Sequence, residues 1–293
     1  MTLLAHPVQE VTRAAMQRWL PQLDAWLLPG AFYGVQHTWP QLYRSDGGGR
    51  FFVVADGERL LSHCAVRTVS LCGPEGTTPV NLLGSVATDP EWRGHGLAST
   101  VLAAALRATA AASPHTLLWA ERPGLYARAG FVDGGPERCL LLARRPRRPL
   151  TGTARLLAFA DHAALHGLHR HKPWRVERSP IEMSGLLTTP GLSTVVLERD
   201  GAVVAYACTG KGADLHGHWH ELGGSDEDLA ELLPAALHLT ASIDGVLLLP
   251  PYRARLRELL GATVVGDATI TGPMVRSLGA PPPARWIDGL DSV

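Results

Sequence analysis

Two glycines and an arginine form the part of this sequence best suited to chemistry. Arg93, Gly94 and Gly96 follow an expected strand that ends at Thr88, and they lead directly into an Ala-rich helix expected over residues 97–112. Glycines at this point leave the first backbone N–H groups of a helix open to a ligand, and the helix dipole makes that end positive. Arg93 adds charge-assisted hydrogen-bond donors. We therefore expect a binding site for a pyrophosphate.

This glycine loop differs from the two common nucleotide-binding loops. No Lys-Ser or Lys-Thr pair follows the glycines, as a P-loop requires, and the spacing is not that of the dinucleotide fingerprint. The loop resembles the signature of the GNAT acetyltransferase superfamily (Arg or Gln, two residues, Gly, one residue, Gly or Ala), which Arg93, Gly96 and Ala98 match. The resemblance implies acetyl-CoA as the co-substrate. The cofactor-binding residues that it implies are Val86, Thr88, Arg93, Gly94, His95, Gly96, Leu97 and Ala98.

A second match to the same superfamily lies downstream. Residues 125–131 resemble its Tyr-x-x-x-Gly-Phe element, with Tyr126, Gly130 and Phe131 at the defining positions. In many members this tyrosine is the general acid that protonates the leaving coenzyme A thiolate, a role that suits a phenol because it is neutral at pH 7 and donates well. The alternative is that Tyr126 only packs its helix against the sheet.

The general base is harder to place. The acceptor amine must reach the thioester carbon neutral and in line, so a group or water relay has to remove its proton. The superfamily often uses a Glu on the strand before the loop, but residues 81–86 contain no carboxylate. Glu121 is the nearest carboxylate and becomes the catalytic candidate beside Tyr126, with an ordinary exposed loop residue as the alternative. His63 and Ser85 are weaker candidates.

The sequence repeats itself. The pairs Asp56-Gly57 and Asp200-Gly201 each lie between two apolar strands, as in a β-hairpin, and a cysteine follows each pair at the same interval. A repeat of this size indicates a duplicated domain, so we expect a mixed α/β fold of two tandem GNAT-like domains. Residues 1–146 form the catalytic domain with the acetyl-CoA site, and residues 147–293 form a degenerate one. An Arg- and Pro-rich linker at 144–149 joins them.

The first half predicts a regular series of elements. We expect helices over 8–20, 97–112 and 124–129, and strands over 50–55, 59–70, 80–88, 116–119 and 138–143. The second half repeats the hairpin but replaces the glycine loop with Ser225, Asp226, Glu227 and Asp228, whose negative charge would repel a pyrophosphate. We expect one coenzyme A per chain, with the second half forming part of the acceptor pocket.

Composition excludes several classes of function. The 293 residues are 46% hydrophobic, and 27 basic residues balance 27 acidic ones, so neither nucleic acid nor an anionic membrane is an expected partner. The four cysteines form no CxxC pair, and no signal peptide or membrane span is visible, which favours the cytoplasm. Two groups of histidines, at 162–171 and 216–220, lack a completing Cys or carboxylate, so we expect no metal.

Together these features predict an N-acetyltransferase that acetylates an amine of a small molecule or peptide. The layout is similar to two-domain members of the superfamily such as mycothiol synthase and the enhanced-intracellular-survival acetyltransferases. The alternative is a non-catalytic module that binds acetyl-CoA as a sensor or to assemble with a partner.

Overall fold

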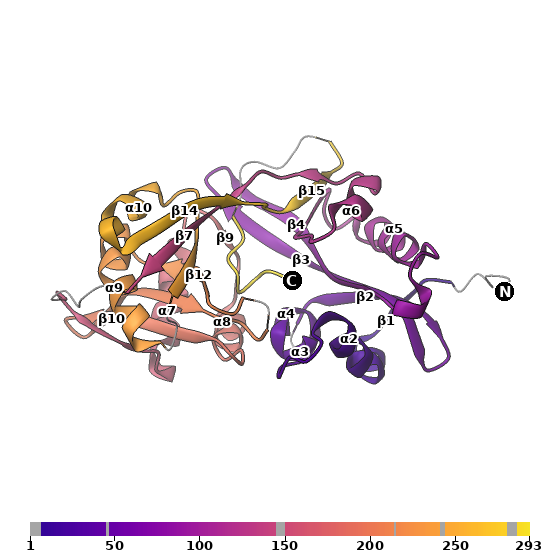
Figure 1. Cartoon of the computed structure of the whole chain (residues 1–293), viewed down its shortest axis with the longest axis horizontal. Coiled ribbons are helices and arrows are strands. Elements are labelled where there is room, and N and C mark those ends of the chain that lie inside the picture. Colours follow the sequence, from indigo (N-terminus) through magenta and orange to yellow (C-terminus); the bar gives the residue numbers. More distant parts are fainter. Residues whose placement is uncertain (1–6, 45–46, 145–149, 214, 241–243, 280–285) are drawn as a thin grey trace.

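The computed structural model describes residues 7–44, 47–144, 150–213, 215–240, 244–279 and 286–293. They form two mixed β-sheets with helices on both faces, which confirms the expected mixed α/β fold (Figure 1). In Figure 1 most of the first sheet is indigo and purple, and most of the second sheet is pink and orange. In the described chain, none of the helices has the length and apolar character needed to span a bilayer.

The first sheet has eight strands. In spatial order they are β1 (Gln9–Val11), β2 (Gly49–Asp56), β3 (Arg59–Gly73), β4 (Gly76–Thr88), β5 (His115–Leu118), β15 (Met274–Ser277) and β6 (Val132–Asp133), while β9 (Arg175–Val176) pairs with β3. Side chains alternate across this sheet as the strand period requires. Phe52 and Val54 therefore pack under helix α5 (Leu97–Thr109), whereas Phe51 and Val53 pack on the opposite face.

Four short helices cover that opposite face. They are α1 (Arg13–Met16), α2 (Leu20–Leu27), α3 (Val35–Thr38) and α4 (Pro40–Tyr43). The expected helix over residues 8–20 was wrong at its start, because residues 9–11 pair with β2 as a strand. The helix begins only after Thr12, whose side chain accepts a hydrogen bond from the backbone N–H of Ala15 and caps it.

The second sheet has seven strands. In spatial order they are β14 (Val264–Ile270), β7 (Glu137–Ala143), β13 (Asp244–Leu249), β12 (His218–Gly223), β11 (Ala202–Thr209), β10 (Ser193–Arg199) and β8 (Thr153–Leu156). Helices α9 (Asp226–Leu239) and α10 (Ala254–Leu260) pack on one face. Helices α7 (His162–Arg170) and α8 (Pro180–Leu187) pack on the other.

Each sheet contains one of the two expected hairpins. β2 pairs antiparallel with β3 around the Asp56-Gly57 turn, and β10 pairs with β11 around Asp200-Gly201. Glycine is required here because Gly57 and Gly201 have φ of 58° and 76°, in the left-handed region. The internal repeat is therefore visible as a structural repeat of the hairpin.

The sheets exchange strands near the middle and the end of the chain. β7 precedes the expected linker yet pairs with β13 and β14, and β15 follows the second sheet in sequence yet pairs with β5 and β6. The division between 1–146 and 147–293 falls at residues 145–149, outside the described chain, and stays a prediction. Each sheet nevertheless contains a strand from beyond that division, so neither half builds its sheet alone.

Candidate functional site

Strand β4 is distorted where the site begins. His63 of β3 pairs with Ala87, but Ala65 pairs with Gly84, so β4 has one more residue than β3 over this stretch, which is a β-bulge. Within it, Ser85 has a φ of 52°, a strained value for a residue with a side chain. Such outliers concentrate at functional sites, and this one re-aims the backbone just before the glycine loop.

The pairing of strands β4 and β5 ends just before the bulge. Their parallel pairing is limited to Asn81 with Thr116 and Leu82 with Leu117, although β4 continues to Thr88. The widening gap leads to a cavity of about 980 Å³. This is the usual place for a ligand in sheets of this kind, outside the carboxyl ends of parallel strands.

The glycine loop lies at one end of this gap. Gly96 caps α5 with a φ of 79° and Gly94 has a φ of 83°, and no described side chain caps the helix. A Cβ built on either glycine would meet no described atom within 4 Å. No described side chain therefore caps the first N–H groups of α5 at the positive end of the helix, which fits a pyrophosphate.

The expected cofactor residues divide into two groups. Val86, Thr88, Arg93 and Ala98 line the cavity. Arg93 is exposed, and its Nε donates to the carbonyl of Thr88 at 3.3 Å, which holds its stem at the end of β4. The other four residues do not line it: Gly94, His95 and Gly96 lie exposed on the loop, and Leu97 packs into the core beneath α5.

Tyr126 reaches the same cavity from the far side of the gap. It lies on α6 (Pro123–Arg128), which follows β5, and its ring meets Phe131 edge-on with centroids 6.1 Å apart. Burial raises the pKa of Tyr126 to about 12, so the phenol keeps its proton at neutral pH. The side chain thus packs against the core and also lines the cavity, and its role as general acid stays a prediction.

Two carboxylates line the cavity. Glu121, the expected base, lies exposed between β5 and α6. Glu137, at the start of β7, was missed by the sequence analysis. It accepts a hydrogen bond from Trp119 Nε1 at 3.3 Å, and burial raises the pKa of its carboxyl. No local motif marks Glu137, because it enters the cavity only through the exchange of β7 between the sheets.

The two weaker candidates for the base are differently placed. His63 is fully buried beside Tyr43 and Phe51, and its Nδ1 lies 2.7 Å from the carbonyl of Ser85. Burial lowers the pKa of His63 to about 4, so it is neutral at pH 7. His63 therefore contacts the backbone of the bulge from within the core. Of the two candidates, only Ser85 lines the cavity.

The second half of the chain forms much of the remaining wall. Leu215, His218, Leu248 and the segment 270–272 lie on the second sheet or its loops, and residues 286–293 add a further stretch. Tryptophan side chains also line the cavity from four separate places, namely Trp26, Trp39, Trp119 and Trp286. The cavity thus lies between the two sheets, and tryptophans from both halves of the chain form part of its wall.

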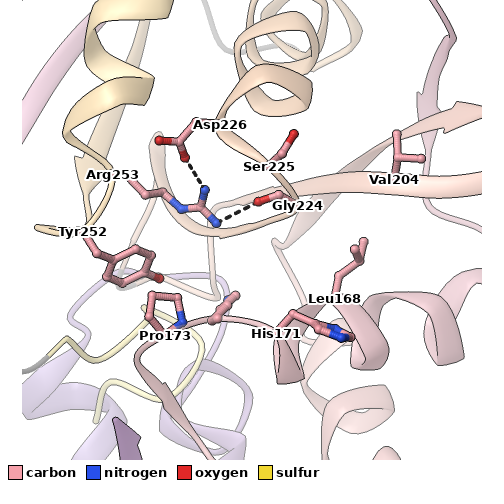
Figure 2. A pocket seen from close by; sticks show the side chains of 10 residues that line it. Leu168, His171, Pro173, Val204, Gly224, Ser225, Asp226, Tyr252 and Arg253 are labelled. Carbon is pink, nitrogen blue, oxygen red and sulfur yellow. Dashed lines mark hydrogen bonds and ion pairs between the residues drawn. The ribbon is translucent and has the colours of Figure 1, made fainter. Parts of the chain in front are cut away.

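The N-terminus of α9 is the counterpart of the glycine loop in the second sheet. Ser225 caps it, and its Oγ accepts the N–H of Asp228 at 3.0 Å. Figure 2 shows Arg253 crossing the adjoining pocket of about 460 Å³, with Nη1 2.6 Å from Asp226 and Nη2 3.2 Å from the carbonyl of Gly224. This helix end is therefore already capped and acidic, and its arginine is already paired.

The histidine groups take part in hydrogen bonds within the protein. His162, His166 and His171 contact Ser184 Oγ and the carbonyls of Arg178 and Gly167 respectively. His169, Glu221 and Asp288 bring ligand atoms within 4.8 Å of one another, as a metal site does. However, the Lys172 ammonium lies 3.0 Å from Glu221 and 2.8 Å from Asp288, and supplies the positive charge there.

Comparison with known protein families points to the same superfamily that the sequence resembles. Residues 9–132 match the model of the acetyltransferase (GNAT) domain. No curated protein sequence matches the chain significantly. Residues 9–132 are therefore a GNAT acetyltransferase domain, which confirms the resemblance seen in the sequence and the expected enzyme class, an acyltransferase.

Solved structures share the fold over nearly the whole chain. A probable N-acyltransferase from Enterococcus faecalis V583 gives a TM-score of 0.70 at 14% identity, covering 92% of this chain and 72% of that one. A GCN5-related N-acetyltransferase from Anabaena variabilis gives 0.67 at 14% identity, with the same coverages of 92% and 72%. Eis1 from Mycobacterium abscessus gives 0.63 at 17% identity, covering 92% and 73%. At these identities the likeness concerns the fold.

Proposed function

We propose that this protein is an N-acetyltransferase that moves an acetyl group from acetyl-CoA to an amine of a small molecule or peptide. The observation that supports this most is a single cavity that joins the end of β4, Arg93 and Tyr126 to a wall from the second sheet. Acetyl-CoA supplies the activated acetyl group as a thioester. The residues of the chain supply binding, orientation and proton transfer.

The end of the cavity beside Arg93 and the start of α5, which we call the cofactor end, holds the pyrophosphate of acetyl-CoA. The uncapped N–H groups at the start of α5 and the Arg93 guanidinium provide donors. Gly94 and Gly96, whose positive φ values favour glycine, bring no side chain that would block the pyrophosphate. The separation of β4 from β5 leaves room for the extended part of the molecule to run toward Tyr126. The counterpart at α9 offers no such donors, so we propose one coenzyme A per chain.

Tyr126 acts as the general acid. Its phenol is protonated throughout the neutral range because its pKa is raised, so it can donate to the thiolate that leaves when the amine attacks. The base is a water relay or Glu121, whose exposed carboxylate lines the same cavity. The rest of the cavity is the acceptor end, where tryptophans on the cavity wall give flat apolar surfaces that hold the acceptor in line for attack.

The alternative of a non-catalytic acetyl-CoA sensor draws support from the absence of a carboxylate at residues 81–86. The two proposals differ in turnover. We expect coenzyme A to be released faster from acetyl-CoA when 1,5-diaminopentane, tyramine or an alanyl dipeptide is added, with a mass increase of one acetyl group on the amine. Saturable acetyl-CoA binding with no release above the buffer rate for any amine would favour the sensor.

A further inference from the structure

Residues 286–293 have two chemically different sides. Trp286, Ile287, Gly289, Ser292 and Val293 line the cavity between the sheets. Asp288 and Asp291 do not line it, and their side chains are fully buried. A segment that forms a cavity wall on one side is thus held on the other side by buried charges.

Both aspartates pair with cations from the second half of the chain, and Asp291 Oδ1 also lies 3.5 Å from Nη1 of Arg67 in the first half. Asp291 Oδ2 accepts from Arg178 at 3.1 Å (Nε) and 2.5 Å (Nη2). Asp288 accepts from Lys172 Nζ at 2.8 Å and from the indole of Trp286 at 2.9 Å. The Trp286 ring, which faces the cavity, is therefore oriented by the same carboxylate that binds the lysine.

A third buried cation holds the backbone of the segment. Lys211 Nζ, on a fully buried side chain, donates to the carbonyls of Gly289 and Ser292 at 2.8 and 2.7 Å and to Ser292 Oγ at 2.8 Å. Gln41, from the first half, also donates to the Ser292 carbonyl at 2.5 Å. The segment is therefore fixed from both halves at the point where it meets the cavity.

Two of the three cations, Arg178 and Lys172, are themselves bound to the core of the second sheet. Glu221, on β12, accepts two hydrogen bonds from Arg178 at 2.7 and 2.9 Å and one from Lys172 at 3.0 Å. Tyr206, on β11, donates to the same carboxylate at 3.0 Å. Buried ion pairs are costly compared with apolar packing of the same size, but they tolerate few alternative arrangements. They suit a segment whose position must be unique.

We propose that Lys172, Arg178 and Lys211 are positioning residues for acyl transfer. They act through residues 286–293, which they fix as the wall against which the acceptor amine is oriented. This inference rests on the proposed function, because the wall belongs to the cavity assigned to acyl transfer. It adds that buried charges of the second half set the geometry of the acceptor end while leaving the cofactor end at α5 independent of them.

The test compares two conservative substitutions in the full-length protein. Asp291→Asn removes the charge on the segment and keeps the shape, whereas Tyr206→Phe keeps the buried ring and removes only the hydrogen bond from its hydroxyl to Glu221, a bond that does not involve the segment. For Asp291→Asn we expect the KM for the best amine among 1,5-diaminopentane, tyramine and an alanyl dipeptide to rise about tenfold, the scale of a lost charged hydrogen bond. The acetyl-CoA dissociation constant should be unchanged, and Tyr206→Phe should leave both values at the wild-type level.

Hydrogen exchange gives a readout independent of turnover. The backbone N–H of Gly289 donates to the carbonyl of His220 at 3.0 Å, and in Asp291→Asn the amides of 286–293 should exchange faster while those of β12 stay protected. If Asp291→Asn fails to fold, Asp288→Asn replaces it, because the Arg178–Asp291 pair then remains. Unchanged exchange and KM, or equal changes in Tyr206→Phe, would overturn the positioning role alone. A wild-type protein that releases no coenzyme A with any amine would instead overturn the proposed function and this inference with it.

Discussion

The N-termini of α5 and α9 follow equivalent strands but present opposite surfaces. β4 and β12 each follow a hairpin, and each pairs in parallel with the next strand through only two residue pairs. After β4 the helix begins at an uncapped glycine beside an exposed arginine. After β12 it begins at a serine cap with three acids in its first turn. The same scaffold thus offers anion-binding donors in one sheet and places a serine cap and acidic side chains at the same position in the other.

The difference shows that the fold alone does not make the site. A helix dipole is present at the N-terminus of α5 and at that of α9, yet of these two helices only α5 leaves its N–H donors without a side-chain cap. At α9, Arg253 is almost fully buried and is bound to Asp226 and Gly224, so the local charge is already compensated. The account therefore predicts large functional effects from changes at α5 and mainly stability effects from changes at α9.

The largest effect is expected from Gly96→Glu. A carboxylate at the start of α5 would occupy the open space before the helix and repel a pyrophosphate, so acetyl-CoA binding should fall below detection in calorimetry. Gly201→Glu is the matched control, because Gly201 has a φ of 76° against 79° for Gly96 and is equally open, but lies in a hairpin turn of the second sheet. Equal acetyl-CoA affinity in the two variants would refute the assignment of the loop.

Tyr126→Phe should give the next largest effect. Loss of the general acid is expected to lower kcat by about 10²–10⁴-fold, with the acetyl-CoA dissociation constant little changed. Because burial raises the pKa of Tyr126 to about 12, the wild-type acid stays protonated as the pH rises from 7 to 10 and is lost only near that pKa. A wild-type turnover rate in the variant would leave Tyr126 as a packing residue.

The smallest effect is expected from Ser225→Ala at α9. Loss of the cap should lower the free energy of unfolding by about 1 kcal/mol, measured by urea denaturation, because one donor of the helix loses its acceptor. Acetyl-CoA affinity should not change. A weaker acetyl-CoA affinity would show that α9 takes part in cofactor binding, contrary to the comparison above.

Much of the first sheet could be predicted from sequence because its signals are local. The Asp-Gly turns fixed both hairpins, and the glycines before an Ala-rich stretch marked the start of α5. The exchange of β7 and β15 could not be predicted, because alternation of apolar residues shows that a strand exists and not which strand it pairs with. Glu137 was missed for the same reason.

The buried charges were missed for a different reason. Lys172, Arg178 and Lys211 stand in polar stretches, and such residues are almost always exposed. Lys172 and Arg178 are paired with Asp288 and Asp291, and Lys211 is bound by the carbonyls of Gly289 and Ser292, all more than 75 residues away in the chain. Only the folded structure brings these groups together, so a local sequence pattern gives no sign of them.

The most direct test of the account is the stoichiometry of acetyl-CoA binding to the full-length protein by isothermal titration calorimetry. The uncapped α5 and the internally satisfied α9 predict saturation at one equivalent per chain, and loss of that single event in Gly96→Glu. A second equivalent, or one equivalent that survives Gly96→Glu, would contradict the claim that only the first sheet holds the cofactor.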